Sequence, residues 1–291
     1  MILHKSCPIC SSNNLTGYAI DCFREGPHIS RVKCKNCGIV FANPMADESE
    51  LIQFYKNPYI ERFQHIRFKE VVKEKIEFVK TFDRKQIQKE APHIDFYKTN
   101  GRFLDIGCGL GLGLAYAHAL GFELYATEYD PVSIDFVKSK FDVQAFQGDL
   151  LDAKYPDNYF DFIYISHVIE HVLDPINYLK EMHRVLKPGG ILAIGTPDIS
   201  SNLYKWYRVF KMMTLSVPLV IDGLEHTFIF PKNLLYKVCK NQGFNIKLHY
   251  GVSLGETIKN LRTYDISLLR KIARYIQNFF KINQWIVCEK L

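Results

Sequence analysis

The sequence predicts an α/β fold with a doubly wound, mostly parallel sheet and helices on both faces, preceded by a small cysteine-rich module. Two observations predict the sheet: apolar strand patterns alternate with helix patterns from Arg102 onward, and the links between them are short. Two Cys-x-x-Cys pairs near the start predict the module. With 291 residues, 47% of them hydrophobic and 23% charged, the chain can bury a core without disulfides.

The chain divides into three predicted parts. Residues 1–44 are rich in cysteine, glycine, asparagine and proline, and we expect them to form a zinc-ribbon module. Residues 45–100 are expected to form a helical connector or cap, because apolar side chains recur at helical spacing in "FKEVVKEKIEFVKTF". Residues 101–291 are expected to form the α/β domain, in which 199–223 is a helical insertion.

Within the third part, the predicted elements follow one another in order. The strand "RFLDIG" precedes the helix "GLAYAHALG", and the strand "ELYATEYD" precedes the helix "PVSIDFVKSKF", which has Pro131 in its first turn. The strands "VQAFQGD" and "FDFIYISHV", the helix "PINYLKEMHRVLKPGG" and the strand "ILAIGTP" come next. The last predicted elements are the helix "PKNLLYKVCKNQGF", a strand near "FNIKLHYGVS", a helix over 267–280 and the strand "QWIVCEKL".

The two cysteine pairs predict a metal site. Cys7 and Cys10 stand in "CPIC", and Cys34 and Cys37 stand in "CKNC". Each pair presents two thiolates from one turn, and four thiolates complete the tetrahedral site that Zn²⁺ favours. Because four protein ligands leave no open position, we expect a structural zinc ion, with redox-active or free thiols as the alternative.

The charge pattern does not by itself predict nucleic-acid binding, since the net charge of +6 is spread along the chain. Contact of the ribbon with nucleic acid is less favoured than local packing or substrate shaping. No apolar run reaches the roughly 18 residues of a membrane span and no secretory leader is recognisable, so we expect a cytoplasmic protein. The apolar, basic residues 203–221 are compatible with a lid over a substrate, peripheral membrane contact or core packing.

A glycine-rich turn follows the first strand of the third part, at Gly107, Gly109 and Gly111. A pyrophosphate-binding turn requires a third glycine where this chain has Leu112 or Leu114, and no Lys-Ser/Thr pair follows. The turn is therefore neither a dinucleotide nor a P-loop motif. Glycines still allow close approach of a ligand to the backbone, and Asp105 can accept from a cationic group.

The stretch "FLDIGCGLG" resembles the first motif of class I S-adenosylmethionine-dependent methyltransferases, which implies a seven-stranded Rossmann-like sheet. The stretches "LYATEYD", "FQGDLLD", "FDFIYISHVIEHVLDP" and "HRVLKPGGILAIGTP" agree with later motifs of this family in order and spacing. The region "EHTFIFPKNLLYKVCKNQGF" is similar to ubiquinone-pathway O-methyltransferases and to sugar or small-metabolite methyltransferases. The segment "CPIC…CKNCGIVFANP" resembles a zinc-binding segment that precedes this domain in bacterial sugar methyltransferases.

The resemblance implies roles for residues at the strand ends. Glu128 would accept both ribose hydroxyls of S-adenosylmethionine, Asp149 would receive the adenine amino group, and Leu150 would offer backbone and apolar contact. The full set of residues expected at the cofactor is Asp105, Gly107, Cys108, Gly109, Gly111, Glu128, Tyr129, Asp149, Leu150 and His167. The alternative for the acidic residues is that they cap helices or form turns.

Methyl transfer to an alcohol benefits from a general base, and histidine suits this task near neutral pH. We expect His226 to be the first candidate and His171 the second. His171 follows His167 by one helical turn, so the two can share a helix face, and Glu170 between them can orient a ring. For each histidine, a structural role is the alternative.

These observations predict an enzyme that transfers a methyl group from S-adenosylmethionine to a small-molecule acceptor. The expected acceptor is a hydroxyl of a sugar, a nucleotide-sugar or a quinone-like metabolite. A ribosomal RNA base methyltransferase that contacts RNA through its zinc ribbon is less favoured, because no Asn/Asp-Pro-Pro-Tyr stretch follows the fourth strand. A cofactor-binding protein without turnover is the third alternative. The sequence does not indicate the oligomeric state.

Overall fold

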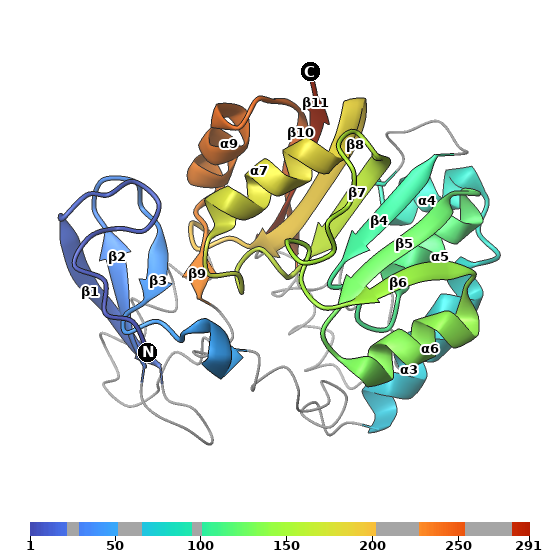
Figure 1. The fold of residues 1–291 in the computed structure, drawn as a ribbon, viewed down its shortest axis with the longest axis horizontal. Helices are drawn as coiled ribbons and strands as arrows, with labels where there is room; N and C mark the ends of the chain where they lie inside the picture. Colours follow the sequence, from blue (N-terminus) through green and yellow to red (C-terminus); the bar gives the residue numbers. More distant parts are fainter. Residues whose placement is uncertain (22–28, 52–65, 95–100, 202–226, 254–280) are drawn as a thin grey trace, which may run out of the picture.

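The computed structural model describes residues 1–21, 29–51, 66–94, 101–201, 227–253 and 281–291. The described residues form a large sheet of seven strands in the order β10-β11-β8-β7-β4-β5-β6 (Figure 1). Five of its strands run parallel: β4 (Arg102–Ile106), β5 (Glu123–Glu128), β6 (Val143–Gln147), β7 (Phe160–Ser166) and β8 (Leu186–Pro197). Two antiparallel strands, β10 (Phe244–Ser253) and β11 (Lys281–Lys290), complete it beside β8.

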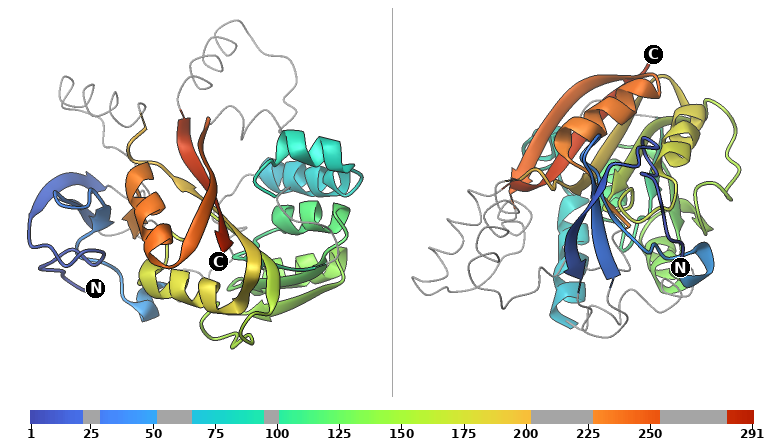
Figure 2. Two further views of the ribbon diagram at one scale, coloured as in Figure 1. Left: turned by 90° about the horizontal axis from the view of Figure 1, so that it is seen from above. Right: turned by 90° about the vertical axis from the view of Figure 1, so that its left-hand side faces the viewer.

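Helices cover both faces of this sheet (Figure 2). The described helices are α3 (Ile66–Val79), α4 (Arg84–Glu90), α5 (Leu112–Ala119), α6 (Pro131–Lys140), α7 (Pro175–Val185) and α9 (Lys232–Asn241). Two of them, α6 and α7, begin with an aspartate cap followed by proline, and Pro131 lies in the first turn of α6 as the sequence predicts. The side chain of Asp130 accepts from two N–H groups at the start of α6, and Asp174 does the same for α7.

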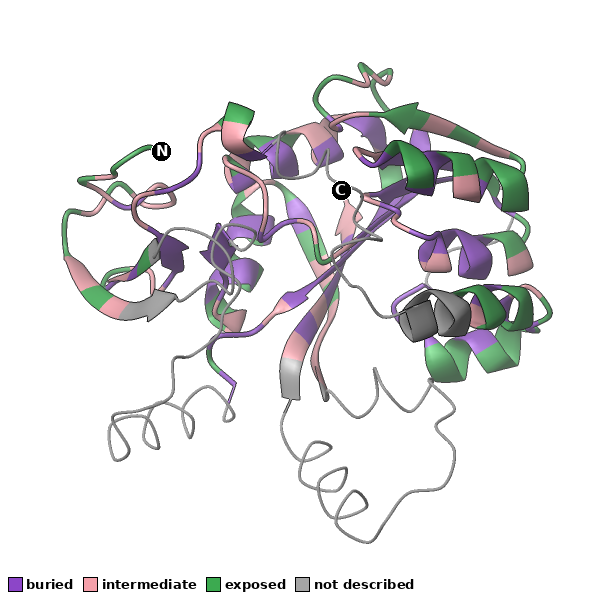
Figure 3. Cartoon of the chain, turned by 90° about the horizontal axis from the view of Figure 1, so that it is seen from below, coloured by how far each residue is buried: buried purple, intermediate pink, exposed green. Residues whose placement is uncertain are grey.

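Alternate strand residues enter two separate cores. Leu104 and Ile106 lie in a cluster with apolar side chains of α7 and α9, whereas Phe103 and Phe162 lie in a cluster with side chains of α3, α5 and α6. The separation follows from the two-residue repeat of a strand, because successive side chains point to opposite faces. Figure 3 shows the result, with buried strands between helices whose outer sides are exposed.

A second sheet of four described strands contains the cysteine pairs at its end. Its order is β1 (Leu15–Asp21), β2 (Ile29–Cys34), β3 (Val40–Ala42) and β9 (Phe228–Ile229), and all its pairs are antiparallel. The strand β9 belongs to the third predicted part of the chain, beyond the boundary expected at residue 44. Phe41 and Phe228 share one core cluster with the large sheet, so the small sheet packs onto the α/β domain.

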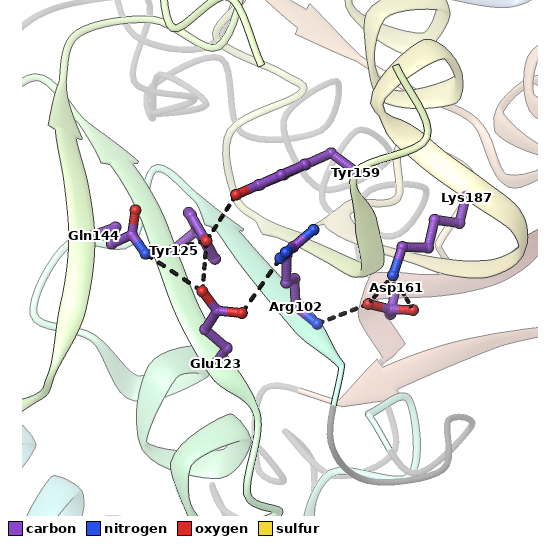
Figure 4. A network of polar contacts seen from close by, with 7 residues as sticks. All are labelled: Arg102, Glu123, Tyr125, Gln144, Tyr159, Asp161 and Lys187. Carbon is purple, nitrogen blue, oxygen red and sulfur yellow. Dashed lines mark hydrogen bonds and ion pairs between the residues drawn. The ribbon is translucent and has the colours of Figure 1, made fainter. Parts of the chain in front are cut away.

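A polar network joins the amino ends of the parallel strands (Figure 4). The N–H of Arg102 donates to Oδ2 of Asp161 at 2.8 Å, and Nζ of Lys187 donates to both oxygens of the same carboxylate. The hydroxyl of Tyr125 donates to Oε1 of Glu123 at 2.6 Å. These contacts lie at the edge opposite to the glycine turn, so they provide control positions for tests of the site.

The expected fold class is confirmed, with one local error. The helix expected over "PINYLKEMHRVLKPGG" ends at Val185, and "LKPGG" begins strand β8. Pro188 has no N–H for a helix, and Gly189 has a left-handed φ of 74°. No helix in the described ranges is long and apolar enough to cross a membrane.

Candidate active site

The turn after β4 carries three glycines in left-handed conformations. Gly107, Gly109 and Gly111 have φ values of 64°, 50° and 82°, which glycine adopts without steric cost. A Cβ on Gly107 would lie 2.4 Å from Cγ2 of Val168, whereas one on Gly109 would meet no atom of the described residues within 4 Å. Between them, burial raises the pKa of the Cys108 thiol well above its usual range. The turn is therefore tightly packed at Gly107 and leaves bare backbone beside open space at Gly109.

Glu128 ends β5 beside this turn. Its Oε2 accepts the N–H of Gly109 at 2.9 Å, and its Oε1 accepts the N–H groups of Tyr129 at 2.7 Å and of Asp130 at 3.2 Å. Burial raises the pKa of Glu128, while these N–H donors oppose the shift. Three backbone donors hold the carboxylate in place, and since a carboxylate has about four acceptor positions, it can still accept from a ligand hydroxyl.

Asp105 lies beneath the turn with only 2% of its surface exposed. Its Oδ2 is buried and has no hydrogen-bond partner in the described part of the chain. A Cβ on Gly113 would approach this oxygen to 2.5 Å, so the first turn of α5 passes directly over it. Burial and the negative charge of Glu128 raise the pKa of Asp105 well above its usual range. A cationic ligand group nearby would offset this shift and favour the carboxylate.

Asp149 follows β6 and is fixed by its neighbours. Its Oδ1 accepts the N–H of Leu151 at 2.8 Å, and its Oδ2 accepts the hydroxyl of Tyr178 at 3.0 Å. Tyr129 also contributes a side-chain hydrogen bond, and burial raises the pKa of Asp149 against these donors. Leu150, which the sequence places at the cofactor, is fully buried in the core.

A charged cluster occupies the turn after β7. Glu170 is fully buried, and its Oε1 lies 3.1 Å from Nδ1 of His167 and 4.0 Å from Nε2 of His171. Its Oε2 accepts the hydroxyl of Thr196 from β8 at 2.8 Å. Burial alone would lower the pKa of His167, but the hydrogen bond and charge of Glu170 outweigh it, and the pKa is raised. The His167 side chain is 46% exposed and that of His171 is 17% exposed, so His167 is the more accessible ring.

The expectation that His167 and His171 share a helix face is wrong. The residues 167–174 form turns, and the next helix, α7, begins at Pro175. His167 has a left-handed φ of 55°, and its N–H donates to the carbonyl of Gly195 at 2.8 Å, which ends β7 without a helical start. The carboxylate of Glu170, rather than a helix, brings the two rings to one place.

His226, the expected first base, and the expected lid 203–221 lie outside the described residues. The adjacent Thr227 is described, and its hydroxyl donates to the carbonyl of His171 at 3.2 Å. The N–H of Phe228 donates to the carbonyl of Glu170 at 2.9 Å. The chain entering β9 therefore contacts the turn that carries Glu170.

The four cysteines of the two pairs converge at the end of the small sheet. Their Sγ atoms all lie within 4.8 Å of one another, and the Cys7–Cys37 and Cys10–Cys34 pairs are each 3.6 Å apart. A tetrahedral site with zinc–sulfur bonds of about 2.3 Å requires sulfur atoms about 3.8 Å apart. The group is thus compatible with zinc. Nδ2 of Asn36 donates to Sγ of Cys10 at 3.5 Å, so a side-chain amide outside the four cysteines also contacts the group.

Comparison with known proteins identifies the family. Residues 104–194 match a family model described as a methyltransferase domain. A demethylmenaquinone methyltransferase of Staphylococcus epidermidis is 30% identical over 161 residues, covering 49% of this chain and 67% of that protein. The chain belongs to the class I S-adenosylmethionine-dependent methyltransferases. The methyltransferase is also 29% identical to a demethylmenaquinone methyltransferase of Staphylococcus haemolyticus over 181 residues, covering 56% of this chain and 74% of the relative.

Solved structures agree on the fold. A SAM-dependent methyltransferase of Thermotoga maritima matches with a TM-score of 0.51 at 18% identity, covering 83% of this chain and 100% of that chain. A SAM-dependent methyltransferase of Methanosarcina mazei matches with a TM-score of 0.50 at 20% identity, covering 68% of this chain and 95% of that one. At these identities the likeness extends to the fold of the methyltransferase and no further.

Sequence reasoning missed two contacts of this site. Thr196, which anchors Glu170, and Val168, which packs against Gly107, carry no chemical signal of their own. The sequence signal that could have indicated the Thr196 contact is the single acidic residue in the apolar stretch "VIEHV", because a buried carboxylate requires hydrogen-bond donors.

Proposed function

We propose that this methyltransferase modifies a hydroxyl group of a small-molecule acceptor. The observation that carries the proposal is the accessible His167 ring held by Glu170, because a hydroxyl acceptor needs a base that can take its proton. The glycine turn tied to Glu128 supports the methyl donor. The similarity to demethylmenaquinone methyltransferases supports a quinone-like acceptor. The resemblance of the four-cysteine segment to one in sugar methyltransferases supports a sugar acceptor. Both acceptor classes therefore belong in the first activity assays.

The described residues fit S-adenosylmethionine in three respects. Glu128 has an acceptor position left for a ribose hydroxyl, and Asp149 follows the next strand, where we expect the adenine. The unpartnered Oδ2 and raised pKa of Asp105 suit a cationic amino group near the turn. Bound S-adenosylmethionine supplies a methyl group on a positively charged sulfur. Holding the acceptor in line with this methyl removes much of the entropic barrier.

The proton of the acceptor hydroxyl needs a base, and the Glu170 cluster supports His167 for this role. Glu170 binds Nδ1 of His167, which leaves Nε2 of the exposed ring to accept the proton. The left-handed backbone at His167 is a strained conformation of the kind found at functional sites. His171 is the second candidate because its ring also lies near Glu170, and His226 stays a prediction from the sequence.

We further propose that Cys7, Cys10, Cys34 and Cys37 hold a structural zinc ion. Cys7 and Cys34 are buried in the core cluster that contains Phe41 and Phe228. A zinc ion here would join the two knuckles that flank the small sheet. Because four cysteine thiolates would complete its coordination, the ion would have no open position for catalysis.

The test of the acceptor class is a methyl-transfer assay with labelled S-adenosylmethionine. We expect labelled product with a demethylated quinol or with a nucleotide-sugar, and none with ribosomal RNA. Product from RNA alone would replace the small-molecule proposal with the RNA alternative. Tight S-adenosylmethionine binding without product from any acceptor class would favour a protein without turnover.

A further inference from the structure

A crevice of about 590 Å³ lies between the small sheet and the α/β domain. One wall comes from β1, β2 and the second cysteine knuckle, and the other comes from the residues after β8 and from α9. The polar side chains of its lining are Tyr18, Lys33, Asn36, Ser200, Asn233 and Lys237. This crevice is separate from the residues expected to hold the methyl donor.

The charge of the crevice is positive. Lys33 on β2 and Lys237 on α9 line its two walls. Among the described lining residues there is no aspartate or glutamate, although Asp198 lies next to the crevice and accepts from Ser200. Neither lysine forms an ion pair within the described ranges of the chain. Two ammonium groups together with the side-chain amides of Asn36 and Asn233 suit a multiply charged anion, and a phosphate ester is the common organic one.

The crevice also lies within reach of the Glu170 cluster. Its wall residues Ile199 and Ser200 continue directly from β8, whose Gly195 accepts the N–H of His167. Four residues of extended chain span at most about 14 Å, so Ile199 lies within that distance of Gly195. An extended molecule could therefore have one end in the crevice and the other at His167.

We propose that this crevice binds the phosphate-bearing part of the methyl acceptor, such as the diphosphate of a sugar nucleotide. The proposal rests on the proposed function and narrows its acceptor to anionic molecules. The volume is larger than a single phosphate requires, and Ile199, Pro231 and Leu234 provide apolar surface for an attached organic group. The small sheet thereby contributes Lys33 to an acceptor site that the α/β domain alone would leave incomplete.

A competing role for the lysines is to balance the charge of the cysteine cluster. Four thiolates around Zn²⁺ carry a net charge of −2, and Cys37 is itself part of the crevice lining. In that case, removal of the lysines would weaken zinc binding. A phosphate subsite predicts instead that zinc binding is retained and phosphate binding is lost.

The test is calorimetric titration of the full-length, zinc-loaded protein with uridine diphosphate and with inorganic pyrophosphate. The variant is Lys33→Gln combined with Lys237→Gln, and the matched control is Lys35→Gln combined with Lys240→Gln, which removes two exposed lysines from the same knuckle and helix. We expect uridine diphosphate to bind wild type and control equally, and the crevice variant at least tenfold more weakly. Affinity for S-adenosylmethionine and the zinc-to-protein ratio should be the same in all three proteins.

Three results would overturn the inference: no binding of either probe to wild type, equal binding to the crevice variant, or loss of zinc from that variant. Failure of the proposed function has a different signature, since the methyl-transfer assay would then give no product with either small-molecule acceptor, whether or not uridine diphosphate binds the crevice.

Discussion

The N–H of Gly109 donates to Oε2 of Glu128 across 2.9 Å, and this contact joins the glycine turn after β4 to the end of β5. Two strands that are neighbours in the sheet thus present one combined surface at their carboxyl ends. Ligands in open α/β sheets bind at this edge. The glycines of the turn supply backbone without side chains, which a ligand can approach closely. The end of the strand supplies the Glu128 carboxylate, which is held in place and can accept a hydrogen bond. We expect a nucleoside joined to an amino acid to use both features.

The glycines at 107 and 109 should tolerate a side chain very differently. We expect Gly107→Ala to destabilise the protein by about 2–4 kcal/mol, because it combines a left-handed backbone with a Cβ 2.4 Å from Cγ2 of Val168. Gly109→Ala should cost only about 1 kcal/mol, since its Cβ would meet no atom in the described part of the chain, yet it should weaken S-adenosylmethionine binding. Urea unfolding and calorimetric titration measure the two effects.

A second-site change checks the reason for this difference. Adding Val168→Ala to Gly107→Ala should recover part of the lost stability, because it removes the atom that the new Cβ meets. No recovery would mean that backbone conformation alone accounts for the cost.

His93 should make the stability depend on pH. Its ring is buried and stacks on Trp285 with centroids 3.7 Å apart, and burial lowers the pKa of His93 to about 3. Because the pKa of His93 in the folded state lies below the usual value of about 6.5, the stabilising contribution of the neutral ring is fully present above pH 6.5. It is lost progressively as the pH drops toward 3. Between these values the free energy of unfolding falls by about 1.4 kcal/mol per pH unit. His93 should therefore lower the free energy of unfolding by about 2 kcal/mol at pH 5 relative to pH 7.

The matched variant is His93→Phe, which keeps a ring beside Trp285 but cannot be protonated. It should lose less free energy of unfolding between pH 7 and pH 5 than the wild type does. Equal losses in urea unfolding at the two pH values would assign the acid sensitivity to other groups.

Glu170 should set the pH dependence of methyl transfer if His167 is the base. The carboxylate raises the pKa of His167, and a base must be unprotonated to act, so kcat should fall as the pH decreases through that pKa. Glu170→Gln removes the charge, so the acid limb of the pH profile should move to lower pH, together with a loss of roughly 10²-fold in kcat. An unshifted limb would show that His167 is not the titrating base.

Replacement of the two histidines separates their roles. His167→Gln should lower kcat by about 10²–10⁴-fold with little change in S-adenosylmethionine affinity. If His171→Gln has the larger effect, the less accessible ring is the base. If neither variant loses activity, His226 becomes the leading candidate.

The zinc proposal predicts a contrast between two buried cysteines. Cys34→Ala should reduce the zinc-to-protein ratio from about one to near zero and lower the melting temperature, because metal binding and folding of such modules are coupled. Cys239→Ala, at an equally buried position on α9, should keep its zinc. Metal analysis of both purified proteins is the measurement, and full zinc content in Cys34→Ala would contradict the site.

The sequence predicted the elements whose signals are local. Pro131 in the first turn of a helix and the glycine turn after the strand β4 are short-range features, and the structure has both. It could not predict β9, because two residues show no strand periodicity and their pairing with β3 depends on contacts far along the chain. It also placed His167 and His171 on a helix, since a left-handed conformation at a histidine leaves no mark in the sequence.

The most direct test of the account is calorimetric titration with S-adenosylmethionine of wild type, Glu128→Ala and a control, Glu123→Ala. Glu123 begins the same strand at the opposite edge of the sheet, where it joins the network of Figure 4. We predict that wild type and Glu123→Ala bind with similar affinity, and that Glu128→Ala binds at least tenfold more weakly, a loss of about 1.4 kcal/mol or more. Equal affinity of all three proteins would contradict the assignment of Glu128, and no binding to wild type would contradict the account as a whole.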